Sequence, residues 1–263
     1  MSKITYLLGA GASCNALPLV NNFNDKLKDF RDRLWEAVQK QATITAVQNR
    51  AIIANVHELF PYNGEYGKDF MESILWLKTI AEKHASIDTY AKKLFIKNDK
   101  ELHKLKATLS CYLLLEQSLQ MTDKRYDNFF ASILTRDASG IPKLHKDVNI
   151  VTWNYDTQLE KSYEGFCTDP SFVYKGLTQN KNIIRLNGTC ALPEKDNVRT
   201  LGHCDFNIPF LEEVIKLFKN FMVPQGAAVG YQPNISFAWE KAGIKDNVRE
   251  TLNGTTTLVI IGY

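Results

Sequence analysis

The residues of this chain best suited to chemistry follow short apolar runs. The first run, Ile4–Leu8, breaks into a glycine-alternating turn, Gly9-Ala10-Gly11-Ala12-Ser13. Glycines in a strand-to-helix turn let backbone N–H groups approach an anion, and the helix start adds about half a positive charge. The turn therefore predicts a phosphate-binding site. The alternative is an ordinary buried strand that ends in a glycine turn.

Two later apolar runs end in side chains that can hydrogen-bond or carry charge. Asp147–Trp153 is followed by Asn154 and Asp156, and Asn182–Leu186 is followed by Asn187-Gly188-Thr189. In open α/β sheets, ligands bind outside the carboxyl ends of the strands, so we expect these residues to share a crevice with the glycine turn. Asp156 has an alternative role as the cap of the helix that follows it.

Strand-like runs alternate with helical patterns along the chain, which predicts an α/β fold with a Rossmann-like, doubly wound parallel sheet. Helical spacing continues from about residue 43 to 120, too long for one crossover helix, so a helical insertion is expected there. Further helices are expected at Tyr126–Leu134, Phe210–Phe221 and Phe237–Leu252. The final run, Thr256–Tyr263, resembles a buried strand. Because parallel sheets rarely end on a bare edge, we expect the polypeptide to continue beyond residue 263.

Composition excludes several classes of function. The 263 residues carry a net charge of +3, without a basic stripe, which argues against nucleic acid as a direct ligand. The five cysteines form no C-x-x-C pair, so we expect no metal site. No apolar run approaches the roughly 20 residues that span a bilayer, and no signal region follows the N-terminus. A cytoplasmic protein without a membrane partner is expected.

The strand ends together resemble the sirtuin superfamily, and are most similar to its bacterial anti-phage branch of NAD-hydrolysing domains. The resemblance spans residues 1–263, and its motifs are the glycine turn, the Pro18 loop, Thr152–Asp156, Arg185–Thr189 and Ile260–Tyr263. It implies that the chain cleaves NAD+ to nicotinamide and ADP-ribose, with NAD as substrate and no metal. It also implies a homo-oligomer, or a complex with a defence partner subunit or a phage-derived activator.

The resemblance assigns roles to individual positions. The glycine turn would hold the pyrophosphate, Asn154 with Asp156 would lie beside the nicotinamide ribose, and position 187 would hold the catalytic histidine of the family. Further contacts with the cofactor are implied for Pro18, Asn22, Gly188, Thr189, Gly262 and Tyr263.

Position 187 departs from this pattern, because the chain has Asn187 there. An amide cannot take a proton as histidine does, so the general base and its roughly 10²–10⁴-fold contribution are lost. The chain as it stands is expected to be weak or inactive. An engineered replacement that keeps bound NAD intact is favoured over a natural inactive enzyme. His203, on a polar loop, is another candidate for the base.

Two functions therefore remain open. One is an NAD+ glycohydrolase weakened by Asn187. The other is a non-catalytic module that senses NAD or ADP-ribose. Sirtuin-type deacylation is disfavoured, because the chain lacks the four-cysteine zinc module of those enzymes.

Overall fold

The computed structural model describes residues 2–46, 65–97, 100–138, 140–169, 177, 182–192, 205–223, 232–240 and 244–262. The chain forms two compact units. The sheet unit comprises Met1–Leu17, Gln120–Cys204 and Asn234–Tyr263, and the helical unit comprises Pro18–Leu119 and Asp205–Pro233. His203 and Tyr263 lie outside the described residues.

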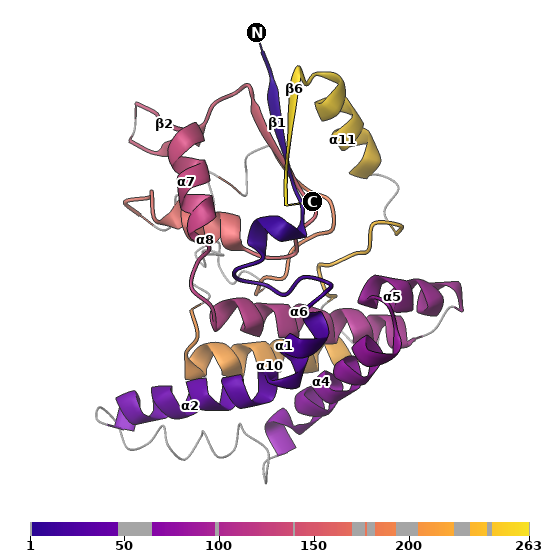
Figure 1. The fold of residues 1–263 in the computed structure, drawn as a ribbon. Coiled ribbons are helices and arrows are strands. Elements are labelled where there is room, and N and C mark those ends of the chain that lie inside the picture. The colour runs from indigo at the N-terminus through magenta and orange to yellow at the C-terminus, as the bar shows by residue number, and fades with distance from the viewer. Residues whose placement is uncertain are drawn as a thin grey trace. The chain divides into compact units, whose positions relative to one another are not determined.

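A four-stranded parallel sheet organises the sheet unit (Figure 1). Its order is β5-β4-β1-β6, with bounds β1 Ile4–Leu8, β4 Val148–Thr152, β5 Ile183–Arg185 and β6 Thr257–Ile261. The register sets Leu8 opposite Thr152 on one side and Ile261 on the other. Because the strands are parallel, their carboxyl ends lie along one edge. The expected α/β class with a parallel sheet is confirmed.

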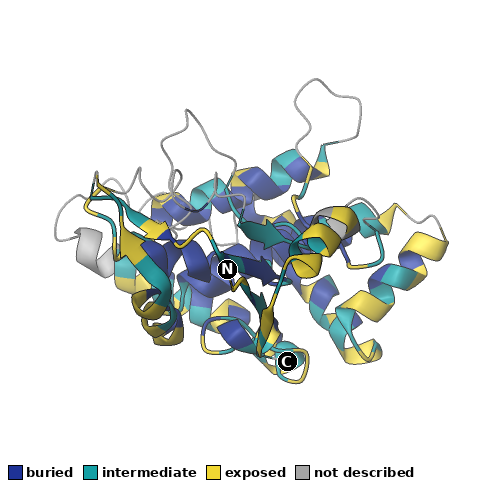
Figure 2. Ribbon diagram, turned by 90° about the horizontal axis from the view of Figure 1, so that it is seen from above, coloured by how far each residue is buried: buried dark blue, intermediate teal, exposed yellow. Residues whose placement is uncertain are grey.

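Successive side chains of a strand point to opposite faces of this sheet. On one face, Leu8 and Ile150 belong to a buried cluster that includes Phe130 of α7 (Lys124–Ile133) and Tyr163 of α8 (Gln158–Glu164). On the other face, Leu7, Val151 and Leu258 share a pocket with residues of α11 (Ile244–Asn253). The edge strand β6 exposes Leu258 and Ile260, and Figure 2 shows it in yellow and teal as it leads to the C-terminus.

The helical unit is built around a buried helix. It contains α1 (Phe23–Lys28), α2 (Phe30–Ala46), α4 (Glu65–Lys83), α5 (Ile87–Ile96), α6 (Glu101–Ser118) and α10 (Ile208–Met222). Most of α6 from Leu105 onward is buried, and α10 contacts α6 and α4. The expected helix at Phe210–Phe221 is present as α10. The helical unit thus includes residues before the 43–120 segment, from Pro18 onward, and residues after it, from Asp205 to Pro233.

Two local features differ from the sequence-based expectations. An antiparallel pair, β2 (Leu134–Arg136) with β3 (Pro142–Leu144), was not expected, because three-residue strands containing Lys and Arg give no apolar alternation. The last helix begins at Ile244, and residues 238–240 form a turn in which Trp239 stacks on Phe237 at 5.4 Å between ring centroids. In the described part of the chain, no helix has the length and apolar character to cross a membrane.

Candidate functional site

The turn after β1 is joined to the end of β6. Gly9 donates its N–H to the Ile261 carbonyl at 2.8 Å, and Gly11 donates to the Gly262 carbonyl at 2.9 Å. The turn itself is a short 3₁₀ helix, Ala10–Ser13. Its first N–H group, that of Ala10, has no acceptor within the helix. Two N–H groups of the expected phosphate cradle are thus already occupied by β6.

Close backbone approach explains two of the glycines. A Cβ on Gly11 would lie 2.9 Å from the Gly262 Cα. Gly262 has a φ of +75°, and a Cβ there would lie 2.1 Å from the Ala12 nitrogen. Glycine at position 11 is therefore required by the packing of two strand ends, whether or not a phosphate binds nearby.

Gly11→Ala is expected to destabilise the chain by about 1–3 kcal/mol, because the added methyl group meets backbone that cannot rotate away. Gly254→Ala is the matched control, since the nearest atom to a Cβ there is the flexible Lys3 Nζ at 3.6 Å. Urea unfolding of both variants measures the difference. Equal stability of the two variants would contradict the packing explanation.

Asn154 ties the end of β4 to this turn. Asn154 is 8% exposed, and its Nδ2 donates to the Gly9 carbonyl at 3.0 Å and to Ser13 Oγ at 3.1 Å. Its backbone N–H donates to Thr152 Oγ1 at 3.1 Å. Asn154 therefore fixes the position of the glycine turn relative to β4.

Asp156, two residues further along the chain, is buried. Burial raises the pKa of the Asp156 carboxyl, whereas the Ser13 hydroxyl, the Gln158 N–H and the Arg185 guanidinium oppose the rise. Oδ1 accepts the Gln158 N–H at 3.0 Å, at the first residue of α8, although the N-cap residue of this helix is Thr157. Among the described residues, Oδ2 has no partner within hydrogen-bond geometry, although the Ser13 hydroxyl lies close enough to affect the pKa. Ser13 Oγ also lies 2.9 Å from the Tyr126 hydroxyl.

A buried ion pair supports the same region from β5. The Arg185 guanidinium donates to the Asp156 carbonyl at 3.1 Å and pairs with the Glu160 carboxylate of α8. The two paired side chains are 17% and 4% exposed. Burial lowers the pKa of Arg185, but the neighbouring carboxylates outweigh it and hold that pKa above its usual value.

Asn187, at the end of β5, is linked to the end of β4. Its Nδ2 donates to the Trp153 carbonyl at 3.1 Å, and its Oδ1 is buried without a partner among the described residues. Its backbone carbonyl accepts the Ser236 N–H at 2.8 Å. The segment around Ile235 thus pairs with the turn that follows β5, and Gly188, with a φ of +82°, leaves room for the Asn234 carbonyl.

Two charged residues that the sequence analysis did not select also hold the glycine turn. Arg125 donates to the carbonyls of Gly11 and Ala12 at 3.1 and 3.2 Å and pairs with buried Asp123. The hydrogen bond from Arg125 lowers the pKa of Asp123. Asp123 caps α7, and an Asp before an amphipathic run signals such a cap. No pattern in the sequence signals the contact of Arg125 with a turn more than a hundred residues away.

The structure therefore gathers most of the expected site residues at the carboxyl ends of the strands. The polar members Asn154 and Asn187 come from adjacent strands, and the glycine turn lies beside them. Pro18 and Asn22 belong to the helical unit and stay predictions. Within the described ranges, no group of three or more His, Cys, Asp or Glu side chains could hold a metal ion.

Comparisons with known proteins found no relative of this chain. No protein-family model matches the chain, and neither a curated protein nor a solved structure matches it. The resemblance to the sirtuin superfamily therefore rests on the motifs and on their positions at the strand ends.

Proposed function

We propose that this chain is an NAD+ glycohydrolase domain of the sirtuin-like, anti-phage type, in which Asn187 leaves the reaction without its general base. Water would replace nicotinamide at C1′ of the ribose, giving ADP-ribose. The pyridinium leaving group is already activated, so the protein contributes orientation and electrostatic stabilisation. The sheet unit would then be the core of a doubly wound Rossmann-like domain, with residues from about 43 to 120 as its helical insertion.

One observation carries the proposal. Asn154 and Asn187 end adjacent parallel strands and are joined through the Trp153–Asn154 backbone, while Asn154 also holds the Gly9–Ser13 turn. Ligands of open α/β sheets bind at such an edge. A dinucleotide with its pyrophosphate at the turn would have its nicotinamide ribose between the two asparagines.

The contacts refine the proposed roles. The amide of Asn154 is engaged with the turn, which favours a positioning role, whereas Asn187 has a free acceptor oxygen among the described residues. In the turn, the Ala10 N–H is the proposed donor to a phosphate oxygen, because the Gly9 and Gly11 N–H groups already bind β6. The proposed setting is the cytoplasm, with activation by assembly or by a phage-derived component.

The alternative function, a non-catalytic sensor of NAD or ADP-ribose, is favoured by Asn187 itself, because an amide retains hydrogen bonding without proton transfer. Nicotinamide release by the assembled Asn187→His protein separates the two. Release supports the hydrolase, whereas binding of NAD+ without release supports the sensor.

A further inference from the structure

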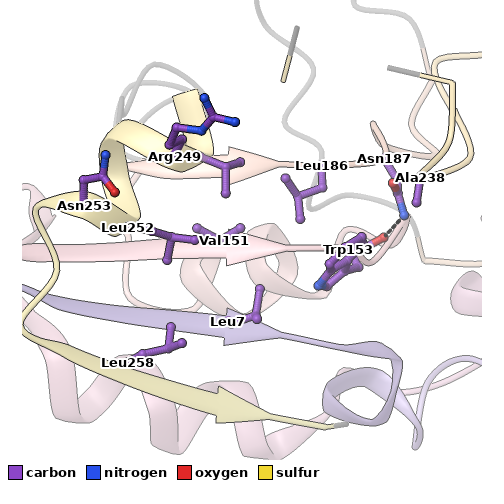
Figure 3. A pocket seen from close by; sticks show the side chains of 11 residues that line it. Leu7, Val151, Trp153, Leu186, Asn187, Ala238, Arg249, Leu252, Asn253 and Leu258 are labelled. Atoms are coloured by element: carbon purple, nitrogen blue, oxygen red, sulfur yellow. Dashed lines mark hydrogen bonds between the residues drawn. The ribbon is translucent and has the colours of Figure 1, made fainter. Parts of the chain in front are cut away.

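A second candidate site lies on the face of the sheet next to α11, and it meets the first site at Trp153 and Asn187. A pocket of about 460 Å³, open to solvent on one side, lies between the strands and α11 (Figure 3). Small-molecule sites typically have volumes of about 300–1,000 Å³ and mainly apolar walls with a few polar groups. Aliphatic side chains from the sheet and from α11 form most of the wall, namely Leu7, Val151, Leu186, Val248, Leu252 and Leu258.

The polar side chains of this pocket lie at its ends. Figure 3 shows Arg249 and Asn253 of α11 at one end, and Trp153 with Asn187 at the other. Arg249 is the charged member of the lining, and it forms no hydrogen bond or ion pair with any described residue. Arg249, Asp246 and Glu250 of α11 are all exposed, and only Arg249 of these three lines the pocket.

This arrangement suits an amphipathic anion. A guanidinium group binds a carboxylate through two parallel N–H donors, and Asn253 adds an amide beside it. One positive charge matches one carboxylate. The aliphatic wall would remove a hydrocarbon chain from water, which favours binding.

We propose that the pocket between the sheet and α11 binds an aliphatic monocarboxylate, with the carboxylate on Arg249 and the hydrocarbon chain against the leucine and valine wall. The inference goes beyond NAD+ binding, because its anion-binding group is Arg249 of α11 and not the glycine turn. At one end, the pocket shares Trp153 and Asn187 with the proposed NAD+ site.

Calorimetric titration with sodium octanoate, in parallel with 1-octanol, tests this proposal. Octanoate is expected to bind the unchanged chain at least tenfold more tightly than octanol, a difference of about 1.4 kcal/mol. Arg249→Gln should remove this preference and leave octanol binding unchanged. Leu252→Trp, at a half-exposed position of α11, should fill the pocket and weaken both ligands.

Lys143→Gln is the matched control, because it removes one positive charge from an exposed position of β3 outside the pocket. It should bind octanoate as the unchanged chain does. Thermal unfolding of each variant confirms that the variant is folded. Three results would overturn the proposal: no octanoate binding to the unchanged chain, equal octanoate affinity of the Arg249→Gln protein, or undiminished binding by folded Leu252→Trp.

Discussion

Replacing Asn187 with histidine is expected to raise nicotinamide release from NAD+ by about 10²–10⁴-fold, the usual contribution of a positioned general base. A neutral imidazole has one donor and one acceptor nitrogen. The donor would replace the Asn187 Nδ2 that bonds to the Trp153 carbonyl, and the acceptor would lie where the Asn187 Oδ1 now has no described partner. The orientation of the new base would thus be fixed by a contact already present.

The gain should depend on proton transfer and on the glycine turn. Asn187→Gln is the matched control, because it changes the side chain but adds no base. In the Asn187→His background, Asn154→Asp should lower release again, since a carboxylate cannot donate to the Gly9 carbonyl.

Both the assembly state and the binding of NAD+ must be established for these measurements. Release is followed in the native assembly, and NAD+ binding is verified by the rise in melting temperature that any ligand of the folded state produces. An assembled, activated Asn187→His protein that binds NAD+ and releases no nicotinamide would contradict the hydrolase and support the sensor.

The second large effect concerns the stability of the sheet unit. Breaking the buried Arg185–Glu160 pair from either side, by Arg185→Met or Glu160→Leu, is expected to cost about 3–5 kcal/mol, because each change leaves a buried charge without its partner. The double variant should be much less destabilised than the sum of the two, since both charges are then absent. Urea unfolding of the four proteins forms a double-mutant cycle. Additive losses would contradict the coupling.

The Arg185→Met loss should also depend on pH. Without the guanidinium, Glu160 and Asp156 are left as neighbouring buried carboxyls, and burial already raises the pKa of Asp156. A carboxyl whose pKa is raised in the folded state holds its proton there and releases it on unfolding. Its contribution to stability is therefore present at low pH and is lost as pH rises through the unfolded-state value toward the folded-state value. The variant should be closer in stability to the unchanged chain at pH 4 than at pH 8.

The sheet could be predicted from sequence because its strands are short, uncharged apolar runs that stop at glycine or polar residues. Ile4–Leu8 and Val148–Thr152 are clear cases. The change from apolar to polar residues at the ends of these runs also identified Asn154 and Asn187, because polar residues that follow buried parallel strands must lie at one edge of the sheet. Local pattern and general topology are sufficient for this part of the site.

Contacts between distant segments could not be predicted in this way. An amphipathic stripe shows that α10 has a buried face but not which helix covers it, so its place beside α6 needed the structure. The sequence shows glycine at positions 11 and 262 without showing that their backbones touch. The pairing of Arg125 with the turn, and the pocket beneath α11, likewise depend on side chains brought together only by folding.

A crystal structure of the unchanged chain with NAD+ bound tests the central claim most directly. Asn187 suits this experiment, because a chain without the general base should leave NAD+ intact. The proposal predicts a pyrophosphate oxygen within hydrogen-bond distance of the Ala10 N–H, and the nicotinamide ribose between Asn154 and Asn187. NAD+ bound away from the strand ends, or no bound NAD+ at millimolar concentration, would contradict it.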